Sequence, residues 1–203
     1  YKIKNMVKNI FNKKTSKSQD DIPTHLEYPK ISIYELIERT ATKYPDNLAY
    51  EYFGNVATYK EFIKKIKTVS SALKKIGVEK NDRVTICMPN TPSAIITFYA
   101  VNMIGATANM IHPLSSENEI LMYLKMAKSK YLLTIDLAYD KVCNIMDKID
   151  LKKVIVSAPN DEMTKTKSAS LNAAKASLVT LSIVLDKGTL SFSSIMASSS
   201  CGS

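Results

Sequence analysis

Short apolar segments alternate with helical patterns between residues 83 and 157, and this rhythm constrains the fold more than any other feature of the sequence. The segments RVTICM, ATANMI, YLLTI and VIVS are rich in aliphatic and β-branched residues and have the length of buried strands. Strands that alternate with helices predict an α/β fold, a largely parallel sheet with covering helices. We expect one sheet with strands at 83–88, 106–111, 131–135 and 153–156, joined by right-handed crossovers.

Capping signals mark where the helices begin. Three S/T-x-x-E capping boxes, in which a hydroxyl and a glutamate satisfy exposed backbone amides, predict helix starts. They are Ser32 with Glu35, Thr58 with Glu61, and Ser116 with Glu119. Thr91 before Pro92 predicts a fourth start, and Gly77 is placed to end a helix in the left-handed conformation. The spacing of Val142, Ile145, Met146 and Ile149 predicts a last helix before residue 153.

A hairpin is expected ahead of these crossovers. The segments LAYEYF and VATY alternate in polarity, and Gly54-Asn55 between them predicts a two-residue turn.

Most of the net charge of +9 comes from the chain ends. Residues 1 to 19 hold six lysines and no acidic residue, whereas residues 20 to 159 hold 18 basic and 16 acidic residues. A nucleic-acid-binding domain would cluster basic residues with aromatic ones on a folded face, so no nucleic-acid partner is predicted.

The cysteines and the apolar runs indicate the compartment. Cys87, Cys143 and Cys201 are odd in number and form no C-x-x-C pair, so neither a disulfide framework nor a zinc site is predicted. No apolar run reaches the roughly 18 residues that span a membrane, and the lysine-rich start lacks the apolar core of a secretory signal. We therefore expect a cytoplasmic protein. The first residue, Tyr1, indicates a chain that begins inside a longer reading frame.

Composition divides the chain into three parts. Residues 1–24 form a basic amphipathic arm and linker, which either docks on its own protein or contacts an anionic membrane through residues 1–14. Residues 25–159 hold the α/β domain. Residues 160–203 are rich in Ser, Ala and Lys without a sustained period, which predicts a disordered tail. Because the change is abrupt, a second interpretation is that the residues from about Thr164 onward are read out of frame.

Motifs that carry chemistry are missing from the sequence. The five glycines are isolated, so neither dinucleotide-binding nor P-loop spacing occurs, and a nucleotide-binding oxidoreductase is disfavoured. The histidines are His25 and His112, and His112 is interpreted as a partly buried structural residue. The paired carboxylates Asp20-Asp21 and Asp161-Glu162 lie in expected linkers, and nothing near Ser198 to Ser200 could activate a hydroxyl.

Two long segments nevertheless resemble a known family. The first is YPKISIYELIERTATKYPDNLAYEYFGNVATYKEF and the second is GVEKNDRVTICMPNTPSAIITFYAVNMIGATANMIHPLSSENEI. Together they resemble the opening of AMP-binding acyl-CoA synthetases of the adenylate-forming superfamily, in which L-T-Y-x-E-L, G-D-R-V-x-I-x-x-P-N-x-P and K-x-G-A-x-x-x-x-x-N-P motifs follow in this order. Asn81 replaces a usual glycine, Ile104 stands before Gly105, and His112 replaces a common asparagine. The resemblance covers roughly Tyr28 to Ser157.

The resemblance implies a ligase that converts a carboxylic acid, of the fatty-acid kind, into an acyl-adenylate and then an acyl-CoA. Complete family enzymes use ATP, magnesium and coenzyme A, bound by later motifs that are not found in this sequence. The chain is thus expected to be an incomplete amino-terminal part of an adenylate-forming enzyme's large domain, inactive alone, with a missing carboxyl-terminal portion. A non-catalytic module that binds membrane surfaces is the alternative.

No catalytic and no metal-ligating residue is predicted, and the cofactor-binding residues stay unknown. Six residues match family positions, and we expect structural duties for them as caps, turns and helix starts. They are Tyr59, Glu61, Asn90, Pro92, Gly105 and Pro113. We also expect the isolated chain to expose a sheet edge and apolar helix faces, and so to aggregate easily.

Overall fold

A computed structural model describes residues 28–157 and 190–191 of the chain. The chain divides into two units, Tyr1–Ile31 and Ser32–Ser203, and the fold described below belongs to the second. Its elements are, in order, α2 (Ile33–Lys43), β1 (Leu48–Tyr52), β2 (Asn55–Thr58), α3 (Tyr59–Lys75), β3 (Arg83–Cys87), α4 (Pro92–Ile104), β4 (Thr107–Ile111), α5 (Glu117–Ala127), β5 (Tyr131–Ile135), α6 (Asp136–Cys143), the 3₁₀ turn η2 (Met146–Lys148), β6 (Lys153–Ser157) and β7 (Leu190–Ser191). Among the residues described, no helix is long and apolar enough to cross a membrane.

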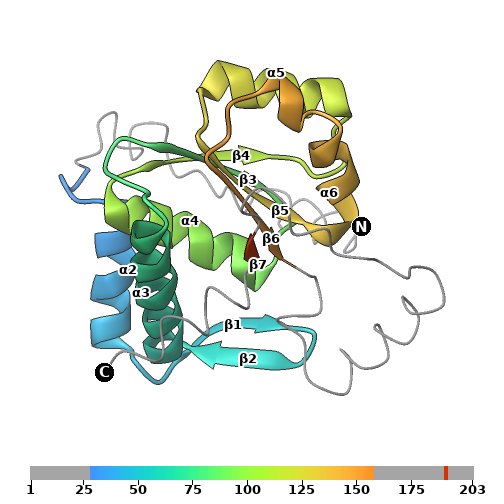
Figure 1. Ribbon diagram of the computed structural model, residues 1–203. Helices are drawn as coiled ribbons and strands as arrows, with labels where there is room; N and C mark the ends of the chain where they lie inside the picture. The colour runs from blue at the N-terminus through green and yellow to red at the C-terminus, as the bar shows by residue number, and fades with distance from the viewer. Residues whose placement is uncertain (1–27, 158–189, 192–203) are drawn as a thin grey trace, which may run out of the picture. The chain divides into compact units, whose positions relative to one another are not determined.

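The main sheet is parallel throughout, with the strand order β4-β3-β5-β6-β7 (Figure 1). The four strands predicted between residues 83 and 157 are confirmed to within a residue at their ends, and so is their parallel pairing. The short strand β7 extends the sheet beyond β6 and lies in the segment predicted to be a tail. The rest of that prediction, and the whole of the arm 1–24, fall outside the described residues.

Helices cover both faces of the sheet because successive strand residues point to opposite sides. Val84 and Ile86 of β3 pack with α3 and α4, whereas Cys87 packs with α5 and α6. Helices α3 and α4 cover one face of the sheet, and α2 packs against both of them. Helix α5 lies across the other face (Figure 1). The apolar residues therefore form two cores, one on each face of the sheet. Strand β5 is buried along its whole length, as expected for a strand of a sheet with covering helices.

The three predicted capping boxes are present, each with both reciprocal hydrogen bonds. Thr91 caps α4, with Pro92 in the first turn, and Gly105 ends this helix in the left-handed conformation at φ 82°. Gly77 follows the end of α3 with φ 96°, as predicted. Local capping chemistry thus fixes where the crossover helices start and stop.

The hairpin of β1 and β2 corrects one prediction. Its two-residue turn is Phe53-Gly54, and Asn55 already pairs with Tyr52. Both turn residues have positive φ, 48° for Phe53 and 82° for Gly54, as this kind of tight hairpin turn requires. Gly54 takes the second turn position, so the turn lies one residue earlier than Gly54-Asn55 predicted.

Helix α6 is shorter than its apolar spacing predicts. It ends at Cys143, and Met146–Lys148 form a separate 3₁₀ turn. Spacings of three residues suit a 3₁₀ helix as well as an α-helix. Val142 and Ile145 are therefore both buried in the α5–α6 core although the α-helix has already ended between them.

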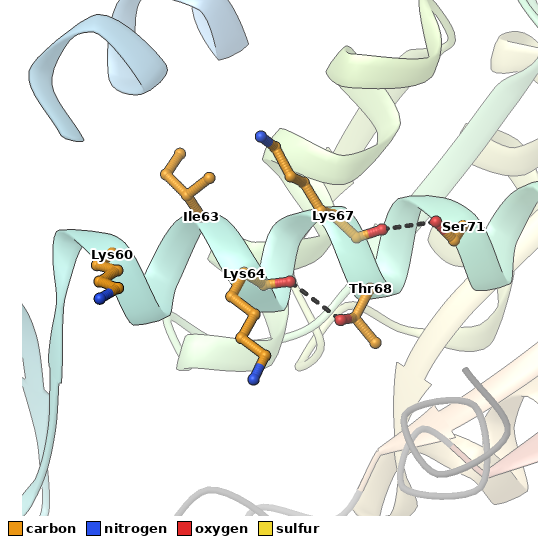
Figure 2. A pocket seen from close by; sticks show the side chains of 6 residues that line it. All are labelled: Lys60, Ile63, Lys64, Lys67, Thr68 and Ser71. Atoms are coloured by element: carbon orange, nitrogen blue, oxygen red, sulfur yellow. Dashed lines mark hydrogen bonds between the residues drawn. The ribbon is translucent and has the colours of Figure 1, made fainter. Parts of the chain in front are cut away.

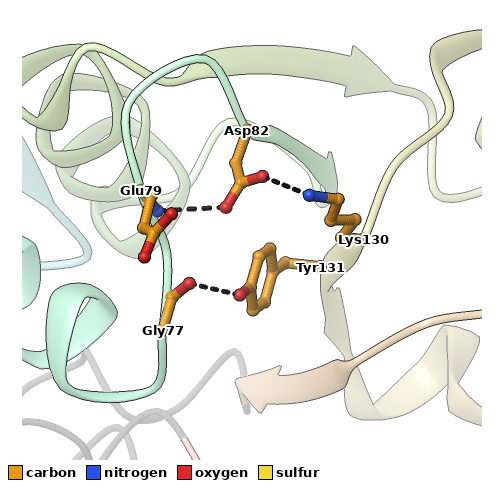
Figure 3. A network of polar contacts seen from close by, with 5 residues as sticks. All are labelled: Gly77, Glu79, Asp82, Lys130 and Tyr131. Carbon is orange, nitrogen blue, oxygen red and sulfur yellow. Dashed lines mark hydrogen bonds and ion pairs between the residues drawn. The ribbon is translucent and has the colours of Figure 1, made fainter.

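A polar network fixes the amino-terminal edge of the sheet (Figure 3). The Asp82 carboxylate accepts hydrogen bonds from Lys130 Nζ at 2.8 Å and from the Glu79 backbone amide at 3.0 Å. The buried Tyr131 donates its hydroxyl proton to the Gly77 carbonyl. These contacts join the loop after α3 to the start of β5 across about fifty residues of sequence.

Candidate functional site

The carboxyl ends of the parallel strands form the candidate site. After β3 the chain adds β4 on one side, and then it returns to add β5 on the other side of β3. In open parallel sheets, ligands bind outside the carboxyl ends of the strands at the point where the order reverses. This rule places the candidate site at the ends of β3 and β5.

Cys87 ends β3 at this point and is completely buried. Its thiol donates weakly to the His112 carbonyl at 3.9 Å, and Thr134 of β5 is its neighbour in the sheet register. Burial raises the pKa of the Cys87 thiol to about 11, and the Thr134 hydroxyl and the Lys141 charge offset this only in part. Because only the thiolate is nucleophilic, Cys87 serves as a packing residue near neutral pH.

The loop between β3 and α4 presents polar groups at this edge. Asn90 is exposed, and the Thr91 hydroxyl accepts a hydrogen bond from the Ala94 amide at 3.3 Å. Because α4 begins at Pro92, shortly after β3 ends at Cys87, the positive end of its backbone dipole lies near the carboxyl end of β3. Asp136 follows β5 directly and is half-buried, with one carboxylate oxygen accepting from the Leu137 amide at 2.8 Å.

His112 follows β4 and corrects a second prediction. Its side chain is exposed rather than partly buried, and Nδ1 accepts a hydrogen bond from the Leu114 amide at 3.2 Å. The neighbouring Pro113 is the buried residue of the pair. The imidazole thus stabilises the turn after β4 from the solvent-exposed side.

Several of the residues that match family positions lie at helix starts and ends, as expected. Glu61 completes the capping box of α3, Pro92 stands at the start of α4, and Gly105 forms its left-handed end. Tyr59 is the first residue of α3. Asn90 is the one residue of this set that lies exposed at the candidate site, beside the chain reversal.

The site offers hydrogen-bonding groups rather than an activated nucleophile. Asn90, His112 and Asp136 follow three neighbouring strands, and they supply an amide, an imidazole and a carboxylate. Asp136 was not identified from the sequence because helix and strand periods do not give the order of strands. Its position directly after a fully buried strand was the available signal.

The described residues do not fit a nucleoside triphosphate with magnesium. Phosphate cradles need adjacent glycines, so that backbone amides approach the oxygens closely. Gly54, Gly77 and Gly105 are each used singly, at positive φ, in a turn or at a helix end. No group of three His, Cys, Asp or Glu residues that could hold a metal occurs in the part of the chain that is described.

Comparisons with known proteins identify relatives of this fold. The family model of the AMP-binding enzyme matches residues 37–198, which runs past Pro159 into the carboxyl-terminal segment. The chain is 25% identical over 142 residues to a long-chain-fatty-acid–CoA ligase of Bacillus subtilis, a match that covers 70% of this chain and 25% of that protein. It is 32% identical over 109 residues to acetyl-coenzyme A synthetase 1 of Candida albicans, covering 51% of this chain and 16% of the synthetase.

Solved structures show the same arrangement of strands and helices. A long-chain-fatty-acid-CoA ligase from Archaeoglobus fulgidus superposes with a TM-score of 0.61 at 25% identity, covering 64% of this chain and 28% of that one. Coronafacic acid ligase from Pectobacterium brasiliense superposes with a TM-score of 0.64 at 18% identity, covering 82% and 29%. The chain therefore spans about a quarter of the length of these three ligases.

Proposed function

Because the chain belongs to the AMP-binding enzyme family, we propose that it supplies the amino-terminal part of the large domain of an acyl-CoA ligase. Such a ligase activates a carboxylic acid with ATP to an acyl-adenylate and then transfers the acyl group to coenzyme A. The observation that carries the proposal is the family match over residues 37–198, and the superposition on a solved ligase structure supports it. The long-chain-fatty-acid ligases of Bacillus subtilis and Archaeoglobus fulgidus, both similar to this chain, favour a fatty acid as the substrate.

The role of this chain in the reaction is to position polar groups for a bound ligand. The parallel sheet aligns the ends of β3, β4 and β5 at one edge, where Asn90 and Asp136 can form hydrogen bonds with a polar ligand. ATP, magnesium and coenzyme A belong to the complete family enzyme, and the described residues hold no cradle for the phosphates. Electrostatic stabilisation of the reacting phosphate is usually the largest contribution to catalysis. We therefore expect the isolated chain to be inactive.

Pyrophosphate exchange tests the proposal. The chain is incubated with ATP, magnesium, labelled pyrophosphate and fatty acids of several lengths, and a complete long-chain ligase is assayed in parallel. The expected result is exchange with the complete ligase and none above the blank with the chain alone. Exchange by the chain that depends on the fatty acid would show that it carries a complete adenylation site, contrary to the proposal.

Residues 1–14 give a second candidate function, contact with an anionic membrane. The observation that favours it is the repeat of Ile3, Met6, Val7, Ile10 and Phe11 in a segment that also holds five lysines and no acidic residue. This arm lies outside the described residues. Deleting residues 1–14 should reduce co-sedimentation of the chain with phosphatidylserine vesicles, and unchanged co-sedimentation would remove this candidate.

A further inference from the structure

Helix α3 carries a row of lysines on its exposed side. Of its six lysines, five fall within an arc of about 100° when the helix is turned at 3.6 residues per turn. These five, which we call the α3 lysine row, are Lys60, Lys64, Lys67, Lys74 and Lys75. All five are exposed, whereas Phe62, Ile66, Val69 and Leu73 on the opposite side are buried. At 1.5 Å per residue the row is about 22 Å long.

Most of this positive charge is uncompensated. Lys67 pairs with Glu38 of α2 at 3.0 Å, but none of the other four side chains in the row makes an ion pair or a hydrogen bond within the described part of the chain. The single acidic residue of α3, Glu61, accepts hydrogen bonds from Thr58 in the capping box. The sixth lysine, Lys65, lies outside the row and donates to the Tyr50 hydroxyl.

The surface between the lysines is shallow. A hollow of about 410 Å³ is lined by Lys60, Lys64 and Lys67 together with Ile63, Thr68 and Ser71. Figure 2 shows these side chains along α3. The two hydroxyls are turned back to their own helix, with Thr68 donating to the Lys64 carbonyl at 3.0 Å and Ser71 to the Lys67 carbonyl at 2.9 Å. The row thus offers charge without a shaped pocket for a small ligand.

We propose that the α3 lysine row is a binding surface for an anionic lipid membrane. A fluid headgroup layer supplies many negative charges without fixed geometry, and this matches long, flexible lysines on an open helix face. Recognition of nucleic acid usually uses arginine, amide or aromatic side chains to contact bases. The positions between the lysines hold Ile63, Thr68 and Ser71 instead. The row shares no residue with the candidate site, and the proposal does not depend on the ligase assignment.

Vesicle binding by matched variants tests this surface. The full chain, with residues 1–14 kept in every variant, is titrated with vesicles of phosphatidylserine and phosphatidylcholine at about 0.1 M salt. The test variant is Lys60→Gln with Lys64→Gln, and the control is Lys125→Gln with Lys148→Gln on the other side of the sheet. Glutamine has a helix propensity close to that of lysine, so the fold is retained. All four lysines are exposed.

The proposal predicts a difference between the two variants. Each lysine near such a surface contributes about fivefold in affinity, so the test variant should bind roughly 30-fold more weakly than the wild type while the control changes much less. Equal binding by both variants overturns the proposal. Binding of the row to a DNA duplex but not to vesicles at the same salt also overturns it. As a second readout, vesicles should protect Lys60 and Lys64 of the wild-type chain from acetylation, and unprotected lysines on bound protein contradict the proposal.

Discussion

Asp82 provides the sharpest stability test because it joins two distant parts of the chain (Figure 3). Burial alone raises the pKa of Asp82, but the hydrogen bonds from Lys130 and from the Glu79 amide outweigh it, and the pKa lies below its usual value. Replacing Asp82 by Asn keeps an acceptor for the Glu79 amide and removes the ion pair. The Lys130 side chain is 51% exposed, so solvent screens the pair. We expect Asp82→Asn to lower the free energy of unfolding by about 1 kcal/mol near neutral pH.

The sign of the pH dependence follows from the lowered pKa. A carboxylate with a depressed folded-state pKa contributes stability above its unfolded pKa of roughly 3.9, and this contribution is lost as pH falls through the folded pKa. Urea unfolding followed by circular dichroism should therefore show the same difference between wild type and variant at about pH 7 and pH 5, and a smaller one at about pH 3.

A matched pair of lysine variants separates the ion pair from general charge effects. Lys130→Gln should couple to Asp82→Asn in a double-mutant cycle, whereas the exposed Lys125→Gln should not couple to it. A difference that persists undiminished at low pH, or equal coupling to both lysines, would refute the ionic explanation.

Four further predictions concern other parts of the fold. Gly105→Ala should lower the free energy of unfolding by about 1–2 kcal/mol in urea titrations, because φ is 82° and the added methyl group would meet Lys80 at 3.2 Å; an unchanged midpoint contradicts this. Alkylation at neutral pH, read by peptide mass spectrometry, should modify the exposed Cys143 and spare the buried Cys87, and fast labelling of Cys87 in folded protein would be the contrary result. Met110→Lys, on the edge strand β4, should reduce concentration-dependent association in light scattering; a wild-type chain that stays monomeric removes the premise. If residues 164–203 are out of frame, another forward frame of the DNA encodes ligase-like helices; protected amides across this segment would contradict that origin.

The strands and helix starts could be predicted because local chemistry determines them. Buried parallel strands read as β-branched apolar runs, and each capping box involves residues three apart in sequence. The turn Phe53-Gly54 was misplaced by one residue because glycine is accepted at either position of such a turn. The early end of α6 was missed because an apolar spacing of three residues does not distinguish α from 3₁₀ structure.

The candidate site could not be predicted from local patterns. Its position depends on β5 pairing with β3 rather than with β4, and this order is a property of the assembled sheet. The contact of Tyr131 with Gly77 spans 54 residues and has no sequence period. The out-of-frame interpretation of the tail stays a prediction, although the family match through residue 198 and the strand β7 both fall within that segment in the present frame.

Titration of the chain with ATP and magnesium shows whether the chain alone forms a triphosphate site, because binding is measured without requiring catalysis. Isothermal calorimetry on the isolated chain should give no saturable heat up to about 1 mM ATP, the upper end of common enzyme affinities for substrates. A complete long-chain ligase measured beside it should bind. One-to-one saturable binding by the isolated chain would contradict the account, since it would require a triphosphate site that the described residues do not form.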